Sequence, residues 1–279
     1  MAIWVRQGRT AYGAGVVKAR ETFVPEPLRL FNDPILIDLL PARVRFVARH
    51  RWVREFTTAR RERGAPGVRG WLLCRVRYFD DAVTAATRRG LRTVVILGAG
   101  LDTRAYRLPE LAGLDVFEVD LPWVQKSKKM RLKRLLGALP ATIRYVPLDF
   151  NTGNLELALA GAGLDAKEPT IFLLEGVIQY LQPEAVHSIL RIVAARPKGT
   201  ELVFSYTRRK VADPRRAQRM SEPWHFLIDP SELQAFLARR GLVLREDVGP
   251  QDLIERYLRP LGRELTVADY GRIARAVVE

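Results

Sequence analysis

A glycine-rich turn directly follows an apolar run in the middle of the chain. Residues 94–104 read VVILGAGLDTR, so Gly98, Ala99 and Gly100 come immediately after a stretch of aliphatic residues. Glycine permits a positive φ and lets the backbone approach a ligand closely, and the N–H groups at the start of a following helix attract anions. The segment predicts a ligand-binding turn between a buried strand and a helix.

Acidic residues follow the next two apolar runs. Asp120 and Leu121 come about twenty residues after the turn, where an acid can accept hydrogen bonds from both hydroxyl groups of a ribose. Asp149 and Phe150 end the third run, where an acid can accept from an adenine amino group while a ring stacks beside it. The pattern indicates an adenosine site, with an ordinary turn as the alternative for the third run.

Two kinds of cofactor present an adenosine, and the glycine pattern separates them. A nicotinamide dinucleotide usually requires the third glycine of GxGxxG, and here Thr103 occupies that position. The sequence therefore favours S-adenosylmethionine, and a dehydrogenase remains the alternative.

The elements that must position these residues alternate between strands and helices. Strand-length apolar runs separated by helical stretches are typical of βα units around a parallel sheet. The predicted strands are 93–97, 115–119, 143–147, 170–174 and 201–206, followed by 242–248 and, at the far side of the sheet, 273–278. The predicted helices are 102–111, 123–139, 155–160, 184–195 and 231–240. We expect an α/β fold with a seven-stranded, mostly parallel sheet.

The first 90 residues contain no convincing strand pattern. Prolines break this stretch into short pieces, because proline ends a helix or lies in its first turn. One helix is expected after Asp33-Pro34 and another over 71–89. The predicted division is a helical N-terminal cap over 1–90 and a sheet domain over 91–279, which carries an acceptor-pocket insertion near 207–230.

On these residues the sequence resembles the leucine carboxyl methyltransferase family, including its bacterial branch of O-methyltransferases linked to polyketide and other secondary metabolism. The matching stretches are RVRYFDD (75–81), VILGAGLDTRAYRL (95–108), FEVDLP (117–122), LDF (148–150), LLEGVIQYL (173–181) and YLRPLG (257–262). The resemblance implies a Rossmann-like class I methyltransferase fold that uses S-adenosylmethionine.

The resemblance also implies a donor site. Its implied members are Arg75 at the donor's carboxylate, Glu175 near its methionine part, Asp120 at its ribose, Asp149 and Phe150 at its adenine, and Gly98, Ala99, Gly100, Arg104 and Leu121 along it. The chain departs from the family at Val76, where a threonine is usual. From the residues alone, Arg75 can instead be a helix-surface charge and Glu175 a helix cap.

The acceptor determines whether the reaction needs a base. Methyl transfer from a sulfonium is an in-line displacement, so the protein mainly aligns the acceptor and excludes water. A carboxylate is already ionised at neutral pH, whereas a hydroxyl group requires a base. We expect His50 and His187 to be surface or packed residues. Tyr180, Tyr206 and His225 are the candidates for positioning the acceptor, with packing as the alternative role.

Charge and composition narrow the choice of acceptor. The chain has 46 Lys and Arg residues against 31 Asp and Glu residues, a net charge of +15. Solvated arginine-rich surfaces, attraction of an acidic small molecule and nucleic-acid binding all fit this charge, the last least well. We expect a small acidic acceptor methylated on a carboxylate in preference to a hydroxyl group. An RNA-directed methyltransferase that modifies a carboxyl on a transfer-RNA base and a non-catalytic adenosine-binding regulator are the alternatives.

The sequence also predicts the compartment. No apolar run approaches the roughly 20 residues that span a bilayer, and no signal-peptide pattern is visible. The single Cys74 is consistent with a reducing compartment. One cysteine and three separated histidines show no metal-ligand spacing. We expect a cytoplasmic protein without a membrane or metal partner, and the sequence does not indicate an oligomeric state.

Overall fold

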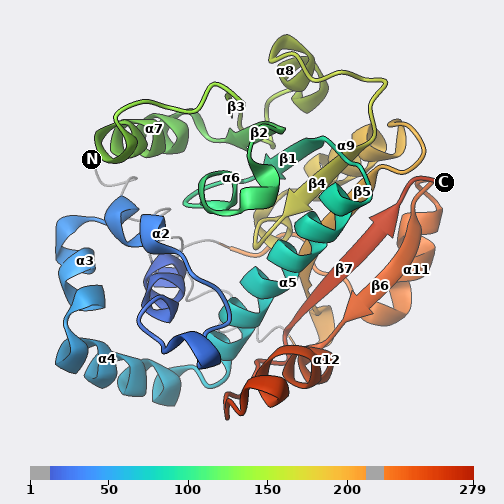
Figure 1. The fold of residues 1–279 in the computed structure, drawn as a ribbon. Coiled ribbons are helices and arrows are strands. Elements are labelled where there is room, and N and C mark those ends of the chain that lie inside the picture. The colour runs from blue at the N-terminus through green and yellow to red at the C-terminus, as the bar shows by residue number, and fades with distance from the viewer. Residues whose placement is uncertain (1–12, 212–222) are drawn as a thin grey trace.

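The computed structural model describes residues 13–211 and 223–279, which form a sheet with helices on both faces (Figure 1). The strands are β1 (Thr93–Leu97), β2 (Asp115–Asp120), β3 (Ile143–Pro147), β4 (Thr170–Leu174), β5 (Glu201–Thr207), β6 (Val243–Val248) and β7 (Gly271–Val277). Their order is β3-β2-β1-β4-β5-β7-β6. The first five strands are parallel, and β7 is antiparallel to β5 and β6. The predicted seven-stranded, mostly parallel sheet is confirmed.

The position of the last strand differs from the prediction. β7 lies between β5 and β6, not at the far side of the sheet. Ile273 packs on one face of β7 while Ala274 and Ala276 pack on the other, so both faces are covered. β6 is less buried along its length, and its Arg245 is exposed, as is typical of an edge strand.

The sheet separates two apolar layers by simple alternation along each strand. Val95 and Leu97 of β1 face one layer, while Val94 and Ile96 face the other. The first layer contains α8 (Leu155–Gly161), α9 (Pro183–Ala194) and α11 (Pro230–Ala238). The second contains α5 (Val68–Arg88), α6 (Arg104–Arg107) and α12 (Pro250–Leu253). Burial on both faces explains why β1 and β4 are almost entirely apolar.

The helix predicted over 102–111 is interrupted. α6 ends at Arg107, and a separate 3-10 turn covers Pro109–Leu111. Leu108 is extended, with ψ of 116°, because a residue before proline avoids the helical region. α7 (Pro122–Leu136) ends three residues before its predicted end, since Gly137 adopts a φ of 79°.

The N-terminal region is helical, as expected. Residues 13–21, α2 (Pro34–Leu39), α3 (Ala42–Arg49) and α4 (Arg51–Gly64) lie beside the sheet (Figure 1). α5 lies in the predicted cap but packs on β4 and β5, so it belongs to the layer of helices on the sheet. Residues 212–222 of the predicted insertion lie outside the described residues.

The described residues show neither a membrane-spanning helix nor a metal-binding cluster. None of the described helices is long and apolar enough to cross a bilayer. Among the same residues, no three His, Cys, Asp or Glu side chains are grouped so that they can hold a metal ion.

Candidate active site

A cavity of about 1500 Å³ lies at the carboxyl ends of the parallel strands, between the sheet and the N-terminal helices. A site for one small molecule commonly has about 300–1000 Å³, so this cavity has room for two ligands. Nearly all the predicted site residues line it: Arg75, Gly98, Ala99, Gly100, Asp120, Leu121, Asp149, Phe150, Glu175, Tyr180, Tyr206 and His225. The fold therefore brings together residues that are far apart in the sequence.

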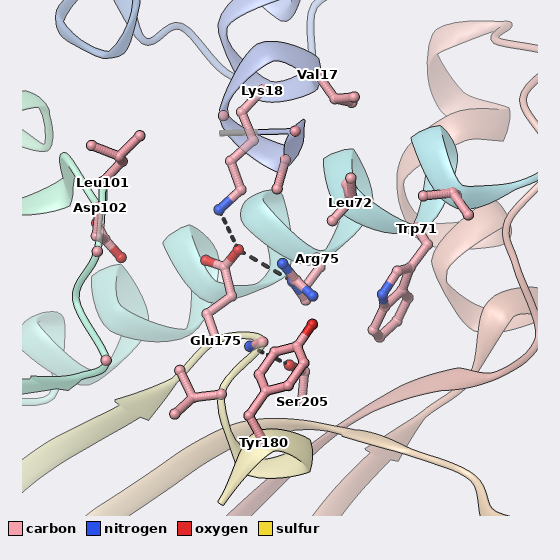
Figure 2. Close-up of a pocket in the computed structure, with 18 of the residues that line it drawn as sticks. Val17, Lys18, Trp71, Leu72, Arg75, Leu101, Asp102, Glu175, Tyr180 and Ser205 are labelled. Atoms are coloured by element: carbon pink, nitrogen blue, oxygen red, sulfur yellow. Dashed lines mark hydrogen bonds and ion pairs between the residues drawn. The ribbon is translucent and has the colours of Figure 1, made fainter. Parts of the chain in front are cut away.

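We divide the cavity into two halves. The donor half consists of the residues that follow β1, β2, β3 and β4, together with Lys18 and Arg75. The acceptor half is lined by residues 23–25, α4, the first two turns of α5, residues 223–225 and Tyr270. In Figure 2, Leu101 and Asp102 lie to the left of Glu175 and Arg75, and Trp71 lies to their right.

The glycine turn is fixed by hydrogen bonds to β2. The N–H groups of Gly98 and Ala99 donate to the Val119 carbonyl at 2.8 and 3.0 Å. Gly98 has a φ of 71°, and a Cβ atom there would lie 2.4 Å from a methyl group of Val177. Only glycine fits this position unless the Val177 side chain shifts.

The predicted anion-binding helix start is not formed, which is a correction. α6 has four residues, and the Arg104 N–H donates to Asp102 Oδ1 at 2.8 Å. The Gly100 and Asp102 N–H groups donate to Asp120 and to the Ala99 carbonyl. These three N–H groups already have partners, so fewer donors remain at the turn for the pyrophosphate of a dinucleotide.

Asp120 is held with its carboxylate at the cavity. The Gly100 N–H donates to Oδ2 at 2.5 Å, and the Leu121 N–H donates to Oδ1 at 2.7 Å. Burial raises the pKa of Asp120, and the two backbone hydrogen bonds partly oppose that shift. A carboxylate has about four acceptor positions, so each oxygen can still accept a hydroxyl group.

Glu175 is the centre of a buried charge cluster (Figure 2). Lys18 Nζ lies 2.6 Å and Arg75 Nε 3.2 Å from Oε1, while Arg104 Nη2 lies 2.6 Å from Oε2. The Glu175 side chain is only 6% exposed. Burial alone would raise the pKa of Glu175, but the three cations hold it well below its ordinary value. The lowered pKa favours the charged form of Glu175.

The sequence profile for leucine carboxyl methyltransferase matches residues 11–194. The chain belongs to the leucine carboxyl methyltransferase family.

Relatives and solved structures agree with this membership. The chain is 34% identical over 277 residues to a Mycolicibacterium paratuberculosis protein named "Putative S-adenosyl-L-methionine-dependent methyltransferase", covering 93% of this chain and 86% of the relative. A Mycolicibacterium gilvum protein of the same name is 36% identical over 223 residues, covering 77% and 71%. A crystal structure of a "putative methyltransferase" from Thermobifida fusca YX matches with a TM-score of 0.60 at 16% identity, over 95% of this chain and 94% of that chain. The structural match supports the Rossmann-like class I methyltransferase fold.

S-adenosylmethionine, the methyl donor in the relatives' names, fits the donor half of the cavity in this family member. The methionine end of S-adenosylmethionine carries one carboxylate and one ammonium group. Lys18 and Arg75 supply two cations, and Glu175 supplies one anion between them. Asp120 supplies acceptors for two hydroxyl groups at the end of the neighbouring strand β2. The charges of the lining residues match both parts of the donor.

Arg104 differs from its predicted role. It is 1% exposed and lies behind the cavity wall, where its guanidinium contacts Glu175, Asp102 and Asp80. Arg104 contacts Glu175 but is not among the described residues that line the cavity. This is a correction of the expectation that it lines the donor.

Lys18 is a residue of the donor half that the sequence analysis did not single out. It lies in the helical residues 13–21 and reaches Glu175 across 157 positions of sequence. Burial lowers the pKa of Lys18, although Glu175 opposes that shift. Its one signal is compositional, because it is the single lysine in the first 90 residues, whose other cations are arginines.

The three residues predicted to position the acceptor differ in their hydrogen bonds and exposure. Tyr206 lines the cavity, but its hydroxyl donates to Asp247 Oδ1 at 2.9 Å, so it is a wall residue and not a free donor. Tyr180 directs its hydroxyl toward Arg75 and Glu175 (Figure 2). His225 lines the cavity as an exposed residue, and its backbone N–H donates to the Gln179 carbonyl at 2.7 Å.

The other two histidines lie away from the cavity lining. His50 stacks on Phe46 with ring centres 3.8 Å apart, and His187 packs near Phe236 at 6.0 Å. Their surroundings agree with the expectation of surface or packed residues.

Proposed function

We propose that this protein transfers the methyl group of S-adenosylmethionine to an oxygen of a small acidic molecule, and that a carboxylate is preferred over a hydroxyl group. The observation that carries the proposal is the pair of cations on Glu175 beside a cavity large enough for a second ligand. When bound, the donor supplies an electrophilic methyl group on a sulfonium.

The donor half orients the donor. Lys18 and Arg75 bind its carboxylate, and Glu175 accepts from its ammonium group. Asp120 accepts from the ribose hydroxyls. Asp149 keeps one oxygen on the Asn151 N–H at 2.9 Å, and its second oxygen accepts from the adenine amino group while Phe150 stacks beside the ring. Contacts at both ends fix the direction of the transferred group, which is the main requirement of an in-line displacement.

The acceptor half supports a carboxylate. Among the described lining residues, His225 is the one histidine, and it is exposed, so no buried imidazole is available there as a general base. A carboxylate needs no base, because it is ionised at neutral pH. In this proposal Tyr180, which lines the cavity, contacts the acceptor, and the N-terminal helices that also line the cavity limit the access of water. We further propose a secondary metabolite as the acceptor and the cytoplasm as the compartment.

A methyl-transfer assay tests this function. The protein is incubated with methyl-labelled S-adenosylmethionine and a panel of aromatic and aliphatic acids with their matching phenols and alcohols. Methyl esters release labelled methanol in alkali, whereas methyl ethers keep the label. Alkali-labile label supports the carboxylate, and alkali-stable label shows a hydroxyl acceptor.

Two other results of this assay would support the alternative functions. Label transferred to total transfer RNA, lost as salt rises, would establish the RNA-directed activity instead. Donor binding with no transfer to any member of the panel or to RNA would favour the regulator.

A further inference from the structure

A cation faces the acceptor half without a counter-ion. Arg69, in the first turn of α5, is half-buried and lines the cavity. Within residues 13–211 and 223–279, no group forms an ion pair or hydrogen bond with its guanidinium. In contrast, Arg75 and Arg263 contact carboxylates. A guanidinium has five N–H donors in a planar fork, so Arg69 offers a carboxylate a two-point contact.

The acids nearest to Arg69 are already engaged. Glu21 is contacted by Arg263, and Glu62 accepts the Gly67 N–H at 2.8 Å. Burial lowers the pKa of Arg69 and the charge of Arg263 lowers it further, while the charges of Glu21 and Glu62 partly oppose that shift. An anion entering the cavity would offset both effects.

An aromatic wall lies beside this cation. The ring centres of Trp71 and Tyr270 are 6.4 Å apart with their planes at 66°, and those of Tyr270 and Trp224 are 6.1 Å apart. All three residues line the cavity. The buried indole N–H of Trp224 has no hydrogen-bond partner in the described part of the chain. A flat ligand with a polar edge matches both the rings and this donor.

α5 sets the distance between the two ends of the cavity. Arg75 contacts Glu175 in the donor half, and Arg69 lies six residues earlier on the same helix, about 9 Å along its axis. Trp71 and Leu72 line the cavity between them. A ligand that reaches both ends must therefore span this apolar stretch.

We propose that Arg69 and the wall of Trp71, Tyr270 and Trp224 form a subsite for a planar aromatic acceptor that carries a carboxylate at the end remote from the methylated oxygen. The proposal rests on the proposed function, because it assigns the second half of the same cavity. It makes the acceptor a diacid or a hydroxy acid, depending on which oxygen receives the methyl group.

Two matched probes test the subsite by calorimetry on protein saturated with S-adenosylhomocysteine. The probes are 4′-hydroxybiphenyl-4-carboxylate and its neutral carboxamide, measured at about 150 mM salt to screen surface attraction. We expect the carboxylate to bind at least about tenfold tighter than the carboxamide, as charge-assisted hydrogen bonds typically provide. Arg69→Gln should abolish the preference without changing carboxamide affinity, and Arg69→Lys should retain part of it.

Controls separate this subsite from general effects. Arg88→Gln, an exposed change at the other end of α5, should leave both affinities unchanged. Trp224→Leu should weaken both probes without changing the preference. Equal affinities in the native protein, no binding of either probe, or an equal loss of both in Arg69→Gln would overturn the proposal.

The same titrations keep the two proposals separate. Tight S-adenosylhomocysteine binding without a carboxylate preference rejects the subsite and leaves the methyltransferase function. Absence of S-adenosylhomocysteine binding rejects that function. The affinities of the two probes for the free protein then test whether Arg69 binds a carboxylate.

Discussion

In the donor half of the cavity Glu175 is contacted by three cations, whereas in the acceptor half Arg69 has no such partner among the described residues. The first arrangement is assembled from four elements and is complete before a ligand enters. The second contains aromatic rings, the arginines Arg54 and Arg69, the α4 acids Glu55 and Glu62, and an indole N–H without a hydrogen-bond partner. The difference suggests that the donor half is preorganised for one cofactor, while the acceptor half obtains its charge balance from the ligand.

The largest expected effect comes from Glu175→Gln. Removing this charge leaves three cations together in a site that is 6% exposed, and breaking such a buried cluster costs about 3–5 kcal/mol. We expect a large drop in the free energy of unfolding, measured in urea, and loss of detectable S-adenosylhomocysteine binding by calorimetry.

A matched control for this change is Glu201→Gln. Glu201 is also buried and contacts two arginines, but it lies at the amino end of β5, away from the cavity lining. Glu201→Gln should lower the free energy of unfolding and leave the affinity for S-adenosylhomocysteine unchanged. Equal donor affinity in native protein and Glu175→Gln would contradict the preorganised donor half.

Asp120→Ala should weaken S-adenosylhomocysteine binding by about 10–100-fold, as loss of hydrogen bonds to a charged group predicts. Asp115→Ala is the control, because Asp115 is an exposed acid at the opposite end of the same strand. NADH should bind to none of these proteins. Tight NADH binding that depends on Asp120 would instead support the dehydrogenase alternative.

The pH dependence should separate donor affinity from stability. Burial raises the pKa of Asp120 above the ordinary value of about 3.9, so it takes up a proton first as the pH falls, and donor affinity declines. A raised folded-state pKa adds stability as the proton binds. The pKa of Glu175 is lowered, so its contribution is present above its unfolded-state pKa and is lost only as the pH falls through the folded-state value.

Titration of S-adenosylhomocysteine and urea unfolding over one pH series check this order. Affinity should decrease before stability does, and Asp120→Asn should remove the early decrease in affinity. Simultaneous loss of both in the native protein would speak against separate titration of the two acids.

The smallest expected effect is that of His225→Ala. With the acceptor found in the methyl-transfer panel, kcat should change by less than about threefold, because an ionised carboxylate needs no base. General bases typically contribute 100-fold or more. A decrease of that size, with a matching loss in His225→Gln, would instead indicate a hydroxyl acceptor.

The strands and the donor-side acids were predictable from local sequence. The central parallel strands β1 and β4 are apolar runs buried on both faces. Asp120 ends β2 and Asp149 closely follows β3, so chain order alone brings them to one edge of the sheet. The order of β6 and β7 was not predictable in this way, since it depends on which strand has both faces covered.

The sequence by itself determined the sheet, the glycine turn and the family. Only the tertiary structure decided which charges meet. Lys18, Arg75 and Arg104 lie 157, 100 and 71 positions from Glu175, and no local pattern encodes contacts over such separations. The same holds for Arg69, which is one arginine among many in the sequence. It becomes distinctive because the fold turns it toward a cavity whose neighbouring carboxylates already have partners.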